Sequence, residues 1–307
     1  MDRRIYRQIV ELGRTPEALE ESIAYLTEHL SHFLRKSERV FICFSEYEEG
    51  NLSWLMEQAV LCCGAVPVVW GPDLRWKTLL QQAFVNKVTA IIGSPRLLLG
   101  LSKLRRQSGT PLAIRRVITA GYPCPDWMID GIVKGLDCEM GGCFTLDISG
   151  VVAGFACGHS WGVHIREQKY GVDIVDAQGR SLSAGQFGEI VLYPKERPEL
   201  RWPLREGGRL ETKPCACGST AVRMMDMVSG WGRDPALLEL EQMLHSWTSV
   251  LDCQVAKGES GLEIEIVCFQ GEKLPKLPTA AKLVVRPWDP QTDAPYSFAR
   301  SRKYEEN

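Results

Sequence analysis

Residues 88–119 read Val-Thr-Ala-Ile-Ile-Gly-Ser-Pro-Arg-Leu-Leu-Leu-Gly-Leu-Ser-Lys-Leu-Arg-Arg-Gln-Ser-Gly-Thr-Pro-Leu-Ala-Ile-Arg-Arg-Val-Ile-Thr. Two short apolar runs, 88–92 and 116–119, flank a stretch from Pro95 to Arg106 that is long enough for a helix. A strand, a helix and a second strand in this order form a βαβ unit, whose strands lie parallel in one sheet. The segment therefore predicts an α/β fold.

The same alternation extends to both sides of this segment. Apolar runs at 39–44 and 66–70 predict further strands, and helices are expected at 51–63, 76–84 and 126–134. We therefore expect a parallel sheet domain over residues 38–145, preceded by an amphipathic helical lead-in at 1–37. Ligands of such sheets gather at the carboxyl ends of the strands, so the loops after these ends form the predicted functional edge.

The pattern changes beyond residue 145. Short strands expected at 162–166, 171–175 and 187–193 predict an appended β-rich subdomain over residues 146–226. A helix at 235–245 and strands at 250–255, 262–269 and 283–286 predict a small α+β lid domain over residues 227–307. The predicted core thus spans 38–226 and has two parts, followed by the lid.

Composition restricts the partners and the location. The net charge of −2 provides no basic field for nucleic acid. No apolar run reaches the roughly 20 residues that a membrane-spanning helix needs, and the N-terminus lacks the apolar core of a signal peptide. We expect a cytoplasmic protein whose eleven cysteines stay reduced.

Two cysteines stand apart from the rest because polar and glycine-rich sequence surrounds them. Cys215 and Cys217 lie one residue apart and can bind one metal ion, and Zn²⁺ takes four ligands in a tetrahedron. Cys157 with His164 supplies the missing pair, and His159 is the alternative imidazole. Such a set without an open position predicts a structural zinc site; in the competing interpretation the thiols bind nothing and Gly218 only turns the chain.

The search for a phosphate-binding loop is negative, since neither G-x-x-x-x-G-K-[ST] nor G-x-G-x-x-G after a strand occurs. Other short segments are informative: Ala120-Gly-Tyr-Pro123, Phe144-Thr-Leu-Asp-Ile148, Cys215-Ala-Cys-Gly218, Val222-Arg-Met-Met-Asp-Met227 and Pro295-Tyr-Ser-Phe-Ala-Arg300. With them, residues 38–307 resemble the AMP-dependent synthetases, the adenylate-forming enzymes, and specifically the phenylacetate–CoA ligase branch.

The resemblance implies a function. Enzymes of this kind activate a carboxylate with ATP and Mg²⁺, release pyrophosphate and pass the acyl group from AMP to CoA. It implies a structural zinc at the cysteine and histidine hairpin, and a hinge at Asp226. It also implies nucleotide contacts at Gly121, Tyr122, Pro123, Phe144, Thr145, Asp147, Glu206 and Arg223, and catalytic basic residues at Arg300 and Lys303.

Departures from the family pattern point to impaired ATP chemistry. The phosphate loop and the subdomain before it are not found at the N-terminus. Ile148 stands where the family has a Mg²⁺-binding glutamate. Glu206 replaces the ribose-binding aspartate, and Arg300 replaces a lysine. The first hypothesis is therefore a shortened acyl- or aryl-CoA ligase acting on a small carboxylic acid, as a homodimer or with a partner protein. The alternative is a non-catalytic protein that binds a nucleotide or an acyl-CoA, or serves as a scaffold.

Overall fold

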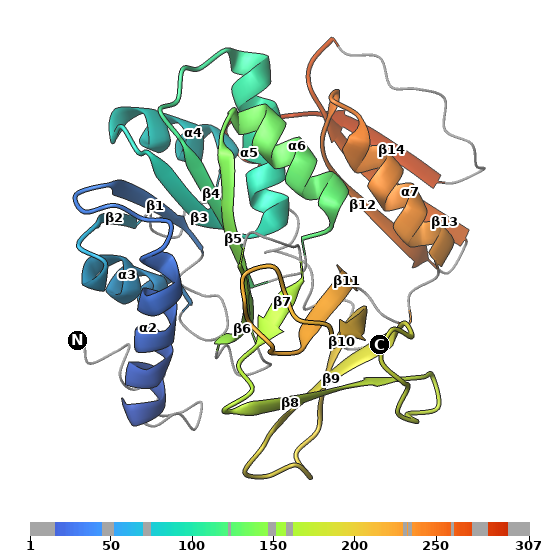
Figure 1. Ribbon diagram of the computed structural model, residues 1–307. Coiled ribbons are helices and arrows are strands. Elements are labelled where there is room, and N and C mark those ends of the chain that lie inside the picture. The colour runs from blue at the N-terminus through green and yellow to red at the C-terminus, as the bar shows by residue number, and fades with distance from the viewer. Residues whose placement is uncertain are drawn as a thin grey trace.

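The structure of the protein is a computed structural model (Figure 1). It describes residues 16–44, 52–69, 75–121, 124–146, 152–157, 162–229, 232, 235–258, 261–271 and 282–293.

A parallel sheet forms the first half of the chain, as predicted. Its strands are β1 (Arg39–Cys43), β2 (Val66–Val69), β3 (Ala90–Gly93), β4 (Arg116–Ala120) and β5 (Glu139–Leu146). They lie in the order β2-β1-β3-β4-β5, and each neighbouring pair is parallel. Their carboxyl ends therefore meet at one edge of the sheet.

Helices cover both faces of this sheet (Figure 1). Helices α2 (Pro16–Leu30) and α3 (Leu52–Cys62) pack on one face; α4 (Trp76–Val85), α5 (Pro95–Ser108) and α6 (Asp126–Leu136) pack on the other. Alternate residues of β1 show the division, because Val40 and Ile42 join the first cluster and Phe41 and Cys43 join the second. Burial on both faces explains why the strands read as continuous apolar runs.

Helix α5 begins at the predicted residue and ends at Ser108, two residues beyond the predicted end. Pro95 occupies its first turn, where its missing N–H costs nothing. Gly109 ends the helix with φ of 66° and donates to the carbonyl of Arg105. In its middle, Gly100 leaves room for the ring of Trp76, since a Cβ at this glycine would lie 1.7 Å from that ring. Helices α4 and α5 therefore pack closely.

The β-rich part continues the same sheet. Its strands are β6 (Val152–Ala156), β7 (Val163–Ile165), β8 (Tyr170–Val175), β9 (Gly188–Pro194), β10 (Trp202–Glu211) and β11 (Arg223–Ser229). Strand β5 pairs with β6 antiparallel, which joins both parts in an 11-stranded sheet of order β2-β1-β3-β4-β5-β6-β7-β11-β10-β9-β8. Two consecutive glycines, Gly207 and Gly208, lie inside β10, where a side chain at Gly208 would collide with Ile190.

The C-terminal unit has the predicted helix and three strands. Helix α7 (Pro235–Ser246) precedes β12 (Val250–Gly258), β13 (Gly261–Cys268) and β14 (Lys282–Pro287), which form a sheet of their own in that order. Leu240 and Leu244 of α7 pack on one face of this sheet. The unit lies beside α5 and α6 (Figure 1).

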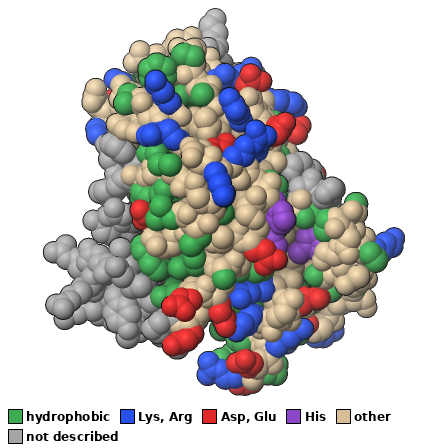
Figure 2. Space-filling view, turned by 60° about the vertical axis from the view of Figure 1, so that its left-hand side comes forward, with side chains coloured by type: hydrophobic (Ala, Val, Ile, Leu, Met, Phe, Trp, Pro, Cys, Tyr) green, Lys and Arg blue, Asp and Glu red, His purple; other side chains and the backbone are tan. Residues whose placement is uncertain are grey.

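Charge is unevenly spread over the surface. Figure 2 shows Lys and Arg side chains gathered over the upper part of one face, and both signs mixed below. The expected lack of a nucleic-acid partner rested on net charge and stays a prediction. Within the residues the structure covers, no helix is both long and apolar enough to span a membrane.

Candidate functional site

The edge at the carboxyl ends of the parallel strands brings several predicted nucleotide contacts together. In the sheet register Ala120 pairs with Phe144, so Gly121 and Thr145 follow side by side. Gly121 has φ of 92°, a backbone conformation that side chains with a Cβ rarely adopt. This turn keeps the chain close to the end of β4, where an approaching ligand would meet backbone instead of a side chain.

Other predicted site residues lie outside the described part of the chain. These are Tyr122, Pro123, Asp147, His159, Arg300 and Lys303. For Phe144 and Thr145 the structure describes the strand but not the side chains. Their predicted roles stay predictions.

Glu206 lies on β10 opposite Ser229, at the end of the last strand before the C-terminal unit. Its Oε2 atom is buried, and none of the described residues forms a hydrogen bond with it. Burial raises the pKa of this carboxyl to about 8, because a carboxylate loses hydration there without a compensating charge. At neutral pH the group is therefore mostly uncharged. A neutral acid can both donate and accept a hydrogen bond.

Arg223 and Asp226 lie on β11, and each has a partner inside the β-rich part. The Arg223 side chain is buried, and Nη2 donates to the carbonyl of Lys213 at 3.0 Å. Asp226 has φ of 52° and forms an ion pair with Arg209 of β10. Strand β11 continues past the predicted hinge to Ser229. The nucleotide contact of Arg223 and the hinge at Asp226 stay predictions.

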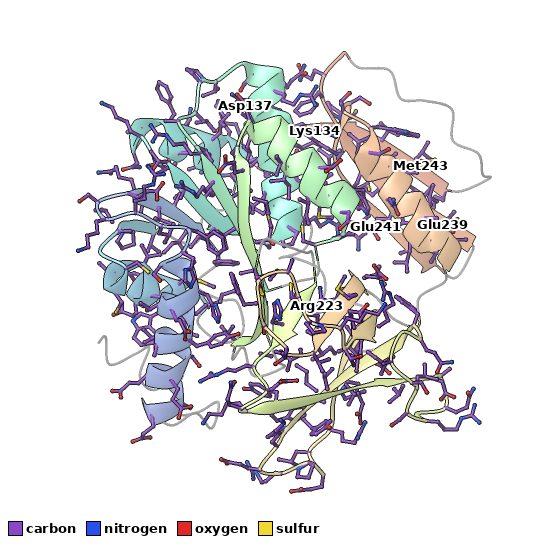
Figure 3. All side chains as sticks on the ribbon, viewed as in Figure 1. Lys134, Asp137, Arg223, Glu239, Glu241 and Met243 are labelled. Carbon is purple, nitrogen blue, oxygen red and sulfur yellow. The ribbon has the colours of Figure 1, made fainter. Side chains whose placement is uncertain are left out.

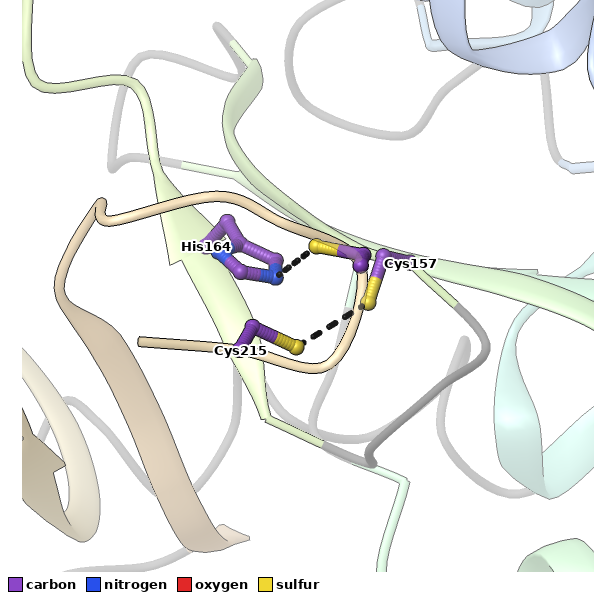
Figure 4. Close-up of side chains that lie close together, drawn as sticks. Cys157, His164 and Cys215 are labelled. Atoms are coloured by element: carbon purple, nitrogen blue, oxygen red, sulfur yellow. Dashed lines mark hydrogen bonds between the residues drawn. The ribbon is translucent and has the colours of Figure 1, made fainter. Parts of the chain in front are cut away.

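The four predicted metal ligands form one cluster. Cys157 follows β6, His164 lies on β7, and Cys215 and Cys217 lie between β10 and β11. Their ligand atoms all lie within 4.8 Å of one another. Cys157 Sγ is 3.6 Å from Cys215 Sγ, and Cys217 Sγ is 3.5 Å from His164 Nε2 (Figure 4).

The two separations of 3.6 Å and 3.5 Å fit a tetrahedral zinc ion. Zinc bonds of about 2.3 Å to sulfur and 2.0–2.1 Å to nitrogen give ligand separations of roughly 3.8 Å between sulfurs and 3.5–3.6 Å between sulfur and nitrogen. The 3.6 Å between Cys157 and Cys215 is also far longer than a disulfide bond of about 2.05 Å. Three thiols and one imidazole form a donor set that can hold one metal ion.

The loop around Cys215 and Cys217 is fixed by its own hydrogen bonds. Cys215 donates its backbone N–H to the carbonyl of Ser219 at 2.9 Å, and Gly218, with φ of 90°, donates back to Cys215 at 2.9 Å. Glu167 accepts the N–H of Val222 at 3.1 Å, which ties the end of the loop to the segment after β7. The thiols are thus preorganised on a closed turn.

Sequence reasoning missed a set of charged residues between α5 and the C-terminal unit. Arg96 pairs with Glu241 at 3.1 Å and Asp252 at 3.3 Å, and Lys103 donates to two carbonyls of the C-terminal unit. No local motif marks these residues, because their partners lie more than 140 positions away.

No sequence profile of a known family matches the chain, and no curated protein matches it. Several solved structures do match the chain. Over 92% of this chain and 69% of the other, it superposes on 2-hydroxyisobutyryl-CoA ligase in the postadenylation state with a TM-score of 0.67 and 15% identity. The chain has the adenylate-forming fold. The same fold occurs in the amide bond synthetase McbA from Marinactinospora thermotolerans, at a TM-score of 0.57, 13% identity and coverage of 92% and 66%.

A benzoate CoA ligase from Burkholderia xenovorans shares the adenylate-forming fold at a TM-score of 0.55 and 12% identity, with 87% of this chain and 62% of the other covered. The chain therefore spans about two thirds of the length of these proteins. Among structures of the 2-hydroxyisobutyryl-CoA ligase, the thioesterification state gives 0.57 and an open conformation 0.56. The postadenylation state thus matches the present arrangement better than these two states do.

Proposed function

We propose that the protein binds an adenine nucleotide at the carboxyl ends of its parallel strands and acts as an AMP-forming acid–thiol ligase. Its substrate class would be a small carboxylic acid, with CoA as acyl acceptor. The main support for this proposal is that one superposition on a CoA ligase covers 92% of this chain. Because one fold can support many activities, the experiment has to test the site itself.

The described residues support a nucleotide at this edge. Gly121 and the end of β5 lie side by side, and the turn at Gly121 leaves backbone accessible. In the proposed site Phe144 stacks on adenine and Tyr122, Pro123 and Thr145 line its pocket. Asp147 and Glu206 contact the nucleotide, Mg²⁺ accompanies ATP, and Arg300 and Lys303 contact the forming acyl phosphate.

Two observations favour a second candidate, a non-catalytic protein that binds a nucleotide or an acyl-CoA. The buried carboxyl of Glu206 is largely neutral at pH 7 because its pKa is about 8, and the guanidinium of Arg223 contacts Lys213 in its own loop. Glu206 therefore lacks the negative charge of the aspartate that it replaces, and Arg223 is held by its own loop. Impaired ATP chemistry, a homodimer or partner protein, and a cytoplasmic location stay predictions.

For the cluster of Cys157, His164, Cys215 and Cys217 we propose a structural zinc ion. The donor set and the 3.5–3.6 Å separations support this metal. Three thiolates around Zn²⁺ leave a net charge of −1, and the buried Arg223, which pairs with His164 in the sheet, lies on the neighbouring strand to offset it. The ion would join the ends of β6 and β7 to the β10–β11 loop.

Pyrophosphate release tests the catalytic proposal. The protein is incubated with ATP, Mg²⁺, CoA and a panel of aryl and short-chain acids. An active ligase releases pyrophosphate with at least one acid, and Arg300→Ala or Lys303→Ala reduces the rate by about a hundredfold. Arg302→Ala is the matched control in the same segment, with no expected effect. Nucleotide binding without any pyrophosphate release would favour the non-catalytic candidate, and neither binding nor release would contradict both.

A further inference from the structure

Helix α5 faces the C-terminal unit with two cations. Arg96 lies in its first turn and Lys103 two turns later, and their partners lie on or next to α7 and β12. Figure 3 shows one of these partners, Glu241, on α7. Both residues belong to the part of the chain that precedes the C-terminal unit, and the partners of their side chains belong to that unit. The contact is therefore an ionic boundary between two parts of one chain.

Arg96 contacts three groups of the C-terminal unit. Its guanidinium forms ion pairs with Glu241 of α7 at 3.1 Å and with Asp252 of β12 at 3.3 Å, and Nη2 donates to the carbonyl of Cys253. Glu241 and Asp252 are 16% and 4% exposed, so water screens neither pair strongly. Removing one partner of such a buried pair is costly because the other charge stays buried alone.

Lys103 ties the same helix to the turn between α7 and β12. Its Nζ donates to the carbonyl oxygens of His245 and Val250, each at 2.7 Å. Those carbonyls lie on either side of the connection between α7 and β12, residues 247–249. The imidazole of His245 lies buried beside these cations and against the ring of Trp127 on α6. Burial, with Arg96 and Lys103 adding to it, lowers the pKa of His245, so this ring adds no positive charge.

Apolar packing continues across the same boundary. Leu251, Val267 and Phe269 of the C-terminal sheet are buried in the cluster that contains α4, α5 and α6. At the same boundary, Arg75, which precedes α4, donates to the carbonyl of Gln291 at 2.8 Å. The face of the C-terminal sheet opposite α7 is therefore part of the main core. A rotation of the unit would expose this apolar surface and separate the buried ion pairs.

We propose that Arg96 and Lys103 form a latch that holds the C-terminal unit against α5 in the observed orientation. A mobile lid, which the family resemblance implies, would have to break every contact of this latch. The latch belongs to an arrangement that resembles the postadenylation state of one CoA ligase more than the open and thioesterification states of that enzyme. The latch does not depend on the proposed ligase activity.

Lysine labelling with an amine-reactive reagent, read by mass spectrometry, reports whether the latch is closed. Lys103 is covered by the C-terminal unit, whereas Lys134 on α6 is exposed and serves as the internal reference. In the native protein we expect Lys103 to be labelled at least about tenfold more slowly than Lys134. Arg96→Met should raise Lys103 labelling by about tenfold or more, since breaking a buried pair strongly favours the open form.

The matched control is Arg105→Met. Arg105 lies on the same helix but donates to Gly135 of α6, within the core, so its loss should leave Lys103 protected. Glu241→Gln is the milder variant if Arg96→Met does not fold, and it should raise labelling in the same direction. Rapid labelling of Lys103 in the native protein, or unchanged protection in folded Arg96→Met and Glu241→Gln, would overturn the latch. Neither result depends on nucleotide binding, so the proposed function is tested separately.

Discussion

Replacing Cys215 by serine tests whether the cysteine and histidine cluster holds the β-rich part together through a metal. Serine keeps the size of the side chain and removes the thiolate that contacts Cys157. If a zinc ion links the four residues, the variant loses both a ligand and the link between the end of β6 and the β10–β11 loop. If the thiols bind no metal, little should change.

The expected magnitude follows from the length of chain that the metal closes. Cys157 and Cys215 are 58 residues apart. A crosslink over such a loop lowers the entropy of the unfolded chain and stabilises the fold by about 4 kcal/mol at 25 °C. For a chain of 307 residues this corresponds to a fall of about 6 °C in the melting temperature.

The assay combines metal analysis with thermal unfolding. The purified protein should contain about one zinc per chain, and a chelator should lower its melting temperature to that of Cys215→Ser. The chelator should have little effect on Cys215→Ser itself. Cys62→Ser is the control, since Cys62 is exposed on α3 and lies outside the cluster. Absence of metal, or equal melting temperatures for Cys215→Ser and Cys62→Ser, would refute the reasoning.

Two further predictions concern stability. Glu206 has a folded pKa of about 8, above its ordinary value of 4.5, so its stabilising effect is present below about pH 4.5 and is lost as the pH rises towards 8. Glu206→Gln should therefore be a few kcal/mol more stable relative to the native protein at pH 8 than at pH 5, as urea unfolding would measure; an equal difference at both pH values would show that this carboxyl is not buried as described. Gly100→Ala should destabilise the protein by about 3 kcal/mol because its Cβ meets the buried ring of Trp76. Gly131→Ala, which meets only a methyl group of Leu99, should cost less, and equal costs in thermal unfolding would contradict the packing of α4 on α5.

The sequence predicts the regular elements best where burial is two-sided. Strands β1, β3 and β4 are continuous apolar runs between helices, and their parallel pairing follows from the alternation alone. Strand β10 was not predicted, because Arg205, Glu206 and two glycines interrupt its apolar pattern. Its place in the sheet depends on β9 and β11, which pair with it from either side.

The candidate metal cluster was accessible from sequence for a different reason. Cysteine and histidine are the typical ligands of zinc, so Cys157 and His164 could be linked to Cys215 and Cys217 over more than fifty residues. The ionic latch of Arg96 and Lys103 could not be predicted from the sequence. Arginine and lysine are common on helices, and only the packing of the C-terminal unit distinguishes Arg96 and Lys103 from solvated neighbours.

Calorimetric titration with AMP, with ATP–Mg²⁺ and with CoA tests the central proposal most directly. We expect saturable heat for at least one adenine nucleotide, close to one site per chain, in the native protein and in Arg302→Ala alike. Binding should weaken about tenfold or more in Phe144→Ala, since stacking of a base on an aromatic ring is worth about 1–3 kcal/mol. No heat with either nucleotide, from a folded protein, would contradict it.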